Sequence, residues 1–502
     1  MTNQRKVGIV LGYANILTKN IVNLVYTPML LYFVGQADYG VYQSCNSFVF
    51  SLTLLSFGFS QAYVRFYMIK KINGTEEEIN RLNTVYLVLY GVVSVLALVL
   101  GVAFASNAET VFSNGFTDNQ ITTASVVMSI LACSIAITLF NSIFDAFVLA
   151  HERFFFQQSR QLAVTLAMPF AAFALLCLGM GVIGVAIAQL VVNIALLGLN
   201  AFFCLKRLRM RFDLHRFDMA LFKSIAVFSS WLFINQICEL INQNVPNILL
   251  GVFSGAVAVA VFAVSIQIRS LFYSLSTTMS NVFIPLINHI VAESNDNNQL
   301  THLMTKVGRY QAILYIWVLG GFVILGKFFI DVWAGPGFEE AYWLVLAMTV
   351  PLFIPLVQNT GIEIQRAKNK HKARSVCYLF MAGLNLAITI LLSPYISYWA
   401  AAIGYISYVI LGCGVFMNWY YQKRIGLSMV YFWKRVLPVV VIGVVATGIC
   451  LYGTSLLPVN DCLSFFWWGI VYTLLYAVLA FMTILTKEER CSLIQKIRRV
   501  AR

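Results

Sequence analysis

Two basic residues, Lys19 and Arg269, lie inside long apolar stretches of this 502-residue sequence. A Lys or Arg at the centre of a membrane span costs about 2.5–3.5 kcal/mol on insertion scales, so it tends to face a cavity rather than lipid. In a wet cavity, such fixed cations can offset the desolvation of an anionic ligand. Both residues are therefore predicted to contact a ligand along a polar pathway.

Amides and one carboxylate accompany these cations at helical spacing. The first set is Asn15, Lys19 and Asn23 at i, i+4 and i+8, and the second is Asn235, Glu239, Asn242 and Pro246 at i, i+4, i+7 and i+11. This spacing places each set on one face of a helix. Two interpretations of Glu239 stay open: it accepts a coupling proton, or it pairs with Lys19 and closes one conformation.

The elements that position these residues are membrane-spanning helices. The chain is 60% hydrophobic and 11% charged, whereas soluble domains carry about 25% charged residues. Apolar blocks recur along the whole length and predict an all-α integral membrane protein with about 14 transmembrane helices. The predicted spans are 8–32, 40–66, 83–105, 120–147, 160–180, 182–204, 224–251, 256–280, 310–330, 341–365, 375–393, 397–420, 434–456 and 464–486.

Basic residues are distributed unevenly between the predicted loops. Nearly all of the 34 Lys and Arg residues fall in the amino terminus, the carboxyl tail and alternate loops, including the loop 151–160 that holds Arg153 and Arg160. Basic loops face the cytoplasm, so both termini are predicted to be cytoplasmic. Orientation and attraction to anionic lipid account for the net charge of +14, which excludes nucleic acid as a required partner. The ten cysteines show no metal-ligand or disulfide spacing.

An internal repeat divides the predicted helices. A shift of 220 residues places Asn15 on Asn235 and Lys19 on Glu239, and a shift of 216 aligns the segments from Gly179 and Tyr395. The repeat predicts two pseudo-symmetric six-helix lobes, residues 1–210 and 211–425, around a central cavity. Residues 426–502 would add two transmembrane helices and a basic cytoplasmic tail.

The segment YFVGQADYGVYQSCNSFVFSLTLLSFGFSQAYVRF resembles a known signature. Its matching positions are Gly35, Tyr39, Gly40, Tyr42, Gly58, Ala62 and Arg65. They resemble the polysaccharide (O-antigen) flippase family of the multidrug/oligosaccharidyl-lipid/polysaccharide (MOP) exporter superfamily. The resemblance implies a flippase, not an enzyme, in the bacterial inner membrane. Its cargo would be an undecaprenyl-diphosphate-linked O-antigen, capsule or exopolysaccharide repeat unit, moved from the cytoplasmic to the periplasmic leaflet by alternating access.

That cargo suggests a role for each candidate residue. Arg269 and Lys19 would contact the diphosphate, because Arg binds phosphate oxygens bidentately. Asn15, Asn23, Asn235 and Asn242 would hydrogen-bond the sugars. Glu239, Pro28 and Pro246 would serve coupling or gating, since proline permits a helix to bend; a static packing kink is the alternative. No cofactor or metal is expected, and proton or sodium coupling stays open. Membrane lipids, a polysaccharide polymerase and glycosyltransferases are candidate partners.

Three other functions are weighed against this one. A cation-coupled multidrug exporter of the same superfamily should have an acidic cavity, whereas the candidates here are two cations and one carboxylate. A lipid II flippase stays open as well, because its cargo also carries a diphosphate that the two cations could contact. A glycan ligase or polymerase would need large outer loops with Arg or His, and the longest predicted outer loop, 106–119, has no basic residue.

Overall fold

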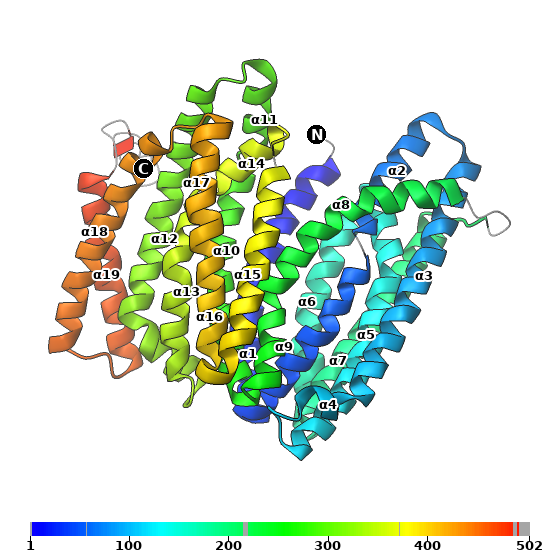
Figure 1. The fold of residues 1–502 in the computed structure, drawn as a ribbon, viewed down its shortest axis with the longest axis horizontal. Coiled ribbons are helices and arrows are strands. Elements are labelled where there is room, and N and C mark those ends of the chain that lie inside the picture. Colours follow the sequence, from blue (N-terminus) through cyan, green and yellow to red (C-terminus); the bar gives the residue numbers. More distant parts are fainter. Residues whose placement is uncertain (1–2, 57, 214–218, 371, 485–488, 491–502) are drawn as a thin grey trace. The chain divides into compact units, whose positions relative to one another are not determined.

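The computed structural model describes residues 3–56, 58–213, 219–370, 372–484 and 489–490, and every regular element in them is a helix (Figure 1). The first half comprises α1 (Asn3–Ser51), the 3₁₀ helix η1 (Leu52–Ser56), α2 (Phe59–Asn73), α3 (Glu76–Ser106), α4 (Ala108–Phe112), α5 (Asp118–Ala150), α6 (Phe154–Cys177), α7 (Gly181–Phe202), the π-helix η2 (Phe203–Arg207), α8 (Met219–Gln243) and α9 (Val245–Phe253). The second half comprises α10 (Ala256–Asn281), α11 (Ile284–Glu293), α12 (Asn297–Ala334), α13 (Glu339–Val357), α14 (Asn359–Ala367), α15 (Lys372–Ile396), α16 (Tyr398–Ser407), the π-helix η3 (Tyr408–Phe416), α17 (Met417–Tyr420), the π-helix η4 (Tyr421–Ile425), α18 (Met429–Leu456) and α19 (Cys462–Thr483).

Twelve helices in the described residues are long and apolar enough to cross a membrane. The first runs for 60 residues, from Ala14 to Asn73, and a single span needs only about 20 residues. It therefore holds most of the predicted span 8–32 and all of the predicted span 40–66. The predicted span 224–251 is not among the twelve; α8 and α9 occupy it instead. The all-helical membrane fold is confirmed, while the number fourteen stays a prediction.

Glycines of the signature segment interrupt this long first run. Gly35 has φ 76° and ψ 171° inside α1, a backbone conformation that is essentially restricted to glycine. Gly58 has φ 72° and precedes the first residue of α2. The absence of a side chain at both positions thus lets the chain turn between consecutive helices.

Left-handed backbone recurs at positions that the internal repeat makes equivalent. The shift of 220 residues pairs Gly35 with Gly255 (φ 89°), and the shift of 216 pairs Gly181 (φ 53°) with Ser397 (φ 51°). A positive φ is uncommon outside glycine, so Ser397 is a notable match. The two halves of the sequence therefore share their turn geometry as well as their residue pattern.

Gly40 of the signature lies against the backbone of α10. A Cβ built on it would lie 1.8 Å from the carbonyl oxygen of Ala256, and a backbone atom cannot rotate away. We expect Gly40→Ala to destabilise the protein by about 1–3 kcal/mol, the usual cost of overpacking a tight contact. The midpoint of thermal unfolding in detergent measures this loss.

Gly91→Ala is the matched control for this prediction. Gly91 lies within α3, and a Cβ there would meet nothing within 4 Å. Alanine also favours a helix interior over glycine, so this variant should unfold at the wild-type temperature or slightly above it. A Gly40→Ala protein as stable as the control would contradict the close approach of α1 to α10.

Two compact units emerge from the contacts within the chain. Unit 1 contains Met1–Ala263 and Leu386–Ala401, and unit 2 contains Val264–Asn385 and Ala402–Arg502. This division does not coincide with the predicted boundaries at 210 and 425, because α8, α9 and the start of α10 pack with the first half. The predicted lobes describe the sequence repeat, and they stay a prediction.

In unit 1, α5 packs against α3 and α7, and α1 packs against α6. In unit 2, α12 contacts α13, α18 and α19. The last two helices, coloured orange to red in Figure 1, both pack against α12, and α19 also binds α12 through hydroxyl groups. Tyr472 donates to the carbonyl oxygen of Ile316 at 3.2 Å, and Tyr476 donates to that of Ile313 at 2.9 Å. The two additional helices are thus an integral part of unit 2.

Candidate functional site

Arg269 is buried inside unit 2. It lies in α10 with 3% of its surface exposed. Its guanidinium carbon is 4.0 Å from the centre of the Tyr405 ring of α16, and its Nη1 is 3.5 Å from the Met348 sulfur of α13. A cation over an aromatic face gains about 2 kcal/mol when it is desolvated. Tyr405 therefore holds the charge of Arg269 within the unit, and no signal in the sequence pointed to this pairing.

The three residues of the first predicted face, on α1, differ in how far they are buried. Asn15 is buried, and its Nδ2 donates to the backbone oxygen and to the Oε1 of Gln158 in α6, at 2.9 and 2.7 Å. Lys19, one turn later, is exposed, and Asn23 is half-buried. Asn15 thus joins α1 to α6, while Lys19 is the member of the face that presents its side chain. The described residues contain no ion pair between Lys19 and Glu239.

The predicted prolines differ in their surroundings. Pro28 lies inside α1, but the backbone of that helix breaks at Gly35 rather than at the proline. Pro246 lies in the first turn of α9, after α8 has ended at Gln243. The helix is therefore interrupted at Asn244 instead of bending at Pro246, because proline is accommodated where its missing N–H is not needed.

On the second predicted face, in α8, one amide is hydrogen-bonded to the backbone of its own helix. Asn242 is buried, and its Nδ2 donates to the backbone oxygen of Cys238 at 2.8 Å. The side chain of Asn235 lies outside the described residues. Glu239 is exposed, so it is the residue of this set that presents a charge.

A polar pocket of about 410 Å³ surrounds Glu239 within unit 1. The carboxyl-terminal end of α8 forms one wall, and the end of α1 with η1 forms the other. The lining residues are Phe50, Thr53, Leu54, Ser56, Gln236, Glu239, Leu240, Gln243 and Asn244. Gln236 and Gln243 flank Glu239 at i−3 and i+4, which is one helical face. That spacing was readable in the sequence.

Residues 30–343, more than half of the chain, match the family model described as polysaccharide biosynthesis protein. The chain belongs to this family. A curated relative, the "Uncharacterized membrane protein EpsK" of Bacillus subtilis (strain 168), is 23% identical over 483 residues, which is 94% of each chain. The sequence-based assignment to the polysaccharide branch is confirmed.

Solved structures show which fold this polysaccharide biosynthesis protein has. The inward-facing conformation of a multidrug resistance MATE family transporter of the MOP superfamily has a TM-score of 0.64 at 15% identity, covering 81% of this chain and 94% of that chain. The MATE multidrug transporter DinF-BH has a TM-score of 0.59 at 16% identity, covering 84% of this chain and 95% of that chain. At these identities the likeness concerns the fold, which is that of a MOP superfamily transporter.

Only some of the candidate residues lie in the region that matches the polysaccharide biosynthesis family. Asn15, Lys19, Asn23 and Pro28 precede it, and Asn235, Glu239, Asn242, Pro246 and Arg269 lie within it. The pocket around Glu239 is formed entirely by matched residues. Among the described candidates, the family resemblance therefore covers the pocket around Glu239, Arg269, Asn242 and Pro246.

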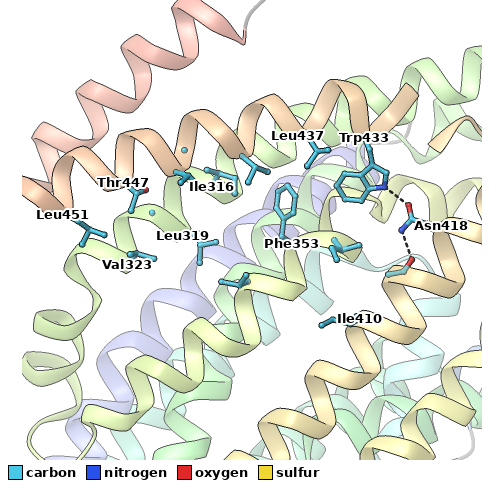
Figure 2. A pocket seen from close by; sticks show the side chains of 18 of the residues that line it. Ile316, Leu319, Val323, Phe353, Ile410, Asn418, Trp433, Leu437, Thr447 and Leu451 are labelled. Atoms are coloured by element: carbon cyan, nitrogen blue, oxygen red, sulfur yellow. Dashed lines mark hydrogen bonds between the residues drawn. The ribbon is translucent and has the colours of Figure 1, made fainter. Parts of the chain in front are cut away.

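This family member also has an apolar groove of about 850 Å³ in unit 2. Figure 2 shows Ile316, Leu319 and Val323 of α12 and Leu437 and Leu451 of α18 along it. One polar cluster lies among the lining residues: Trp433 Nε1 donates to Asn418 Oδ1 at 2.7 Å, and Asn418 Nδ2 donates to the Gly414 carbonyl oxygen at 2.7 Å. The polar atoms of this cluster thus bond to one another, and the rest of the lining, apart from Thr447, is apolar and suits a hydrocarbon.

Arg160 corrects a sequence-based expectation. It was assigned to a basic cytoplasmic loop, but it lies in α6 and is 8% exposed. Its Nη1 donates to Asp145 Oδ1 at 2.5 Å and to Asn200 Oδ1, and Asn200 Nδ2 donates to Asn141 Oδ1 at 2.8 Å. The cluster joins α5, α6 and α7. Its members are 15 or more residues apart across different helices, except Asn141 and Asp145, so the sequence offered no local signal.

Proposed function

We propose that this protein is a flippase that moves an undecaprenyl-diphosphate-linked oligosaccharide from the cytoplasmic to the periplasmic leaflet by alternating access. The observation that carries the proposal is the match of residues 30–343 to the polysaccharide biosynthesis family, on a transporter fold. In this proposal the protein is a carrier and not an enzyme. It resides in the bacterial inner membrane with both termini in the cytoplasm.

Charged and polar side chains support such a cargo. Lys19 is exposed on α1, and an ammonium in a membrane-spanning helix is suited to meet a diphosphate. Arg269 would contribute a bidentate phosphate contact. Because Arg269 is 3% exposed here, that contact requires a conformation in which its guanidinium leaves the Tyr405 ring.

The apolar groove supports the lipid part of the cargo. A prenyl chain, like a lipid tail, is compatible with an apolar wall and needs no polar partner. The groove between α12, α13, η3 and α18 has an almost wholly apolar lining. It therefore has the chemistry that the hydrocarbon of a lipid-linked sugar, or of a membrane lipid, would need.

A cation-coupled multidrug exporter is the second candidate. The observation that favours it is the likeness of the fold to MATE multidrug transporters, together with the exposed carboxylate of Glu239. A lipid II flippase is a third candidate, since its cargo carries the same diphosphate. The proposal of an oligosaccharide flippase also includes coupling to a proton or a sodium ion. Its proposed partners are a polysaccharide polymerase and glycosyltransferases.

The experiment uses a strain from which the gene is deleted. We expect complete diphosphate-linked repeat units to accumulate on the cytoplasmic leaflet, because the step that exposes them to the outer side is missing. Extraction of lipid-linked glycans, with a membrane-impermeant label to report sidedness, measures the accumulation, and the wild-type gene should relieve it.

Drug susceptibility of the same strain is the control. A multidrug exporter predicts greater sensitivity to lipophilic cations and an unchanged pool of lipid-linked glycan. That combination would replace the flippase with the exporter. Accumulation of lipid II instead of repeat units would assign the third candidate.

A further inference from the structure

We infer that the polar pocket of unit 1, formed by η1 and the end of α8, is a subsite that binds the hydroxyl groups of a neutral sugar residue. This inference deepens the proposed function and rests on it. It assigns the glycan part of the cargo to residues that differ from the amide faces predicted from the sequence.

The size of the pocket suits a small organic group. Its volume is about 410 Å³, within the range of about 300–1,000 Å³ that is typical of ligand pockets. A metal ion bound by oxygen ligands at about 2.3–2.6 Å needs far less room. The pocket therefore fits a sugar ring better than a bare coupling ion.

The lining chemistry favours hydroxyl groups over a phosphate. Three amides, Gln236, Gln243 and Asn244, carry N–H donors and carbonyl acceptors. Ser56 adds a hydroxyl group, and the Thr53 hydroxyl, which donates to the Phe50 carbonyl oxygen at 2.7 Å, keeps its lone pairs as acceptors. A sugar hydroxyl donates and accepts at once, so it matches both ends of an amide. Neither Lys nor Arg is among the described lining residues. An anion would meet the Glu239 carboxylate without a compensating cation.

An aromatic ring completes the arrangement. Phe50 lines the pocket and is 46% exposed. Binding sites combine apolar and aromatic surface with a few placed polar groups, and the ring can cover the C–H face of a sugar. A lipophilic cation would also accept a ring and a carboxylate. However, most of the polar lining is uncharged, which favours the sugar.

Both walls of the pocket are made where helices are interrupted. The α-helix gives way to the 3₁₀ helix η1 at Leu52, and α8 ends at Gln243 before Asn244. Irregular backbone at membrane depth is tolerated where it is buried in protein or lines a wet cavity. The two interruptions lie at the polar lining, which is the part of the pocket suited to water and hydroxyl groups.

The test measures binding to the purified full-length protein in nanodiscs. One probe is the repeat-unit oligosaccharide, released by mild acid from the lipid-linked glycan of the parent strain and labelled at its reducing end. The second probe is undecaprenyl diphosphate without a sugar. Gln236→Leu and Gln243→Leu should each weaken oligosaccharide binding about tenfold, the cost of leaving a sugar hydroxyl unpaired. Both variants should bind undecaprenyl diphosphate as the wild type does, which also shows that they are folded.

Gln299→Leu is the matched control, because it removes an exposed amide from α12, outside the pocket. It should bind both probes like the wild type. Unchanged oligosaccharide binding in Gln236→Leu and Gln243→Leu would overturn the subsite and leave the flippase standing. A wild-type protein that binds undecaprenyl diphosphate but not the oligosaccharide would overturn it as well.

Glu239→Gln distinguishes a sugar from a cation. The variant keeps a hydrogen-bonding group and removes the charge, so oligosaccharide binding should fall less than in Gln236→Leu. Tetraphenylphosphonium is the cationic probe. Three results together would show that the pocket is a cation site. The wild type binds tetraphenylphosphonium, Glu239→Gln abolishes that binding, and the oligosaccharide does not compete with it. The inference then fails. Failure of the flippase itself is seen separately, as an unchanged glycan pool in the deletion strain.

Discussion

Replacing Arg269 by methionine is expected to lower transport about tenfold or more while leaving the protein folded. A buried charge can often be exchanged for an apolar side chain of similar size without loss of stability, and Arg269 is buried against Tyr405 and Met348. If the guanidinium binds the diphosphate in another conformation, its loss removes charge-assisted hydrogen bonds, and transport should fall about tenfold or more. The measurement is restoration of surface glycan in the deletion strain at matched protein level.

Arg269→Lys refines the same prediction. Lysine keeps the charge but lacks the planar group that stacks on a ring and binds phosphate bidentately, so partial transport is expected. Lys327→Ala is the matched control. Lys327 Nζ lies 5.5 and 5.1 Å from the ring centres of Tyr342 and Trp343, and its side chain is exposed. It should transport normally. Wild-type transport by a stable Arg269→Met protein would show that Arg269 serves packing alone.

Removing Asp145 is expected to be the most destabilising single change among the charged residues discussed. Asp145→Ala would leave the Arg160 guanidinium, whose side chain is 7% exposed, without its carboxylate. Breaking a buried ion pair costs about 3–5 kcal/mol. Because the Asp145 side chain is 38% exposed, we expect about 3 kcal/mol, at the lower end of that range. The midpoint of thermal unfolding in detergent reports the loss.

Two further variants make this prediction specific. Glu77→Ala breaks a surface pair with Arg81 in which the Glu77 side chain is 81% exposed; such pairs contribute about 0.5 kcal/mol or less, so stability should hardly change. The double variant Asp145→Leu with Arg160→Met removes both buried charges, and it should recover much of the stability. If Asp145→Ala unfolds like Glu77→Ala, the cluster does not hold α5, α6 and α7 together.

How much of the candidate site was predictable depends on the distance over which its residues interact. The exposed Glu239 was singled out from a stripe on a single helix, and Gln236 and Gln243 share that helix at readable spacing. Asn15 was assigned to the cargo, yet it bonds to Gln158, 143 residues away. A polar residue in a span signals only that a partner is needed. Whether the partner is a ligand or a neighbouring helix depends on packing between distant segments.

The sequence by itself determined the class, the family and the positions of two turns. Membrane insertion depends on composition within about 20 residues, and a left-handed turn depends on one residue, so Gly35 and its repeat equivalent Gly255 could be read directly. Only the tertiary structure decided that Arg160 is buried beside Asp145, that Arg269 rests on Tyr405, and that η1 meets α8 around a pocket. These contacts join helices far apart in the chain, and helical periodicity shows which face of a helix is polar, not which helix faces it.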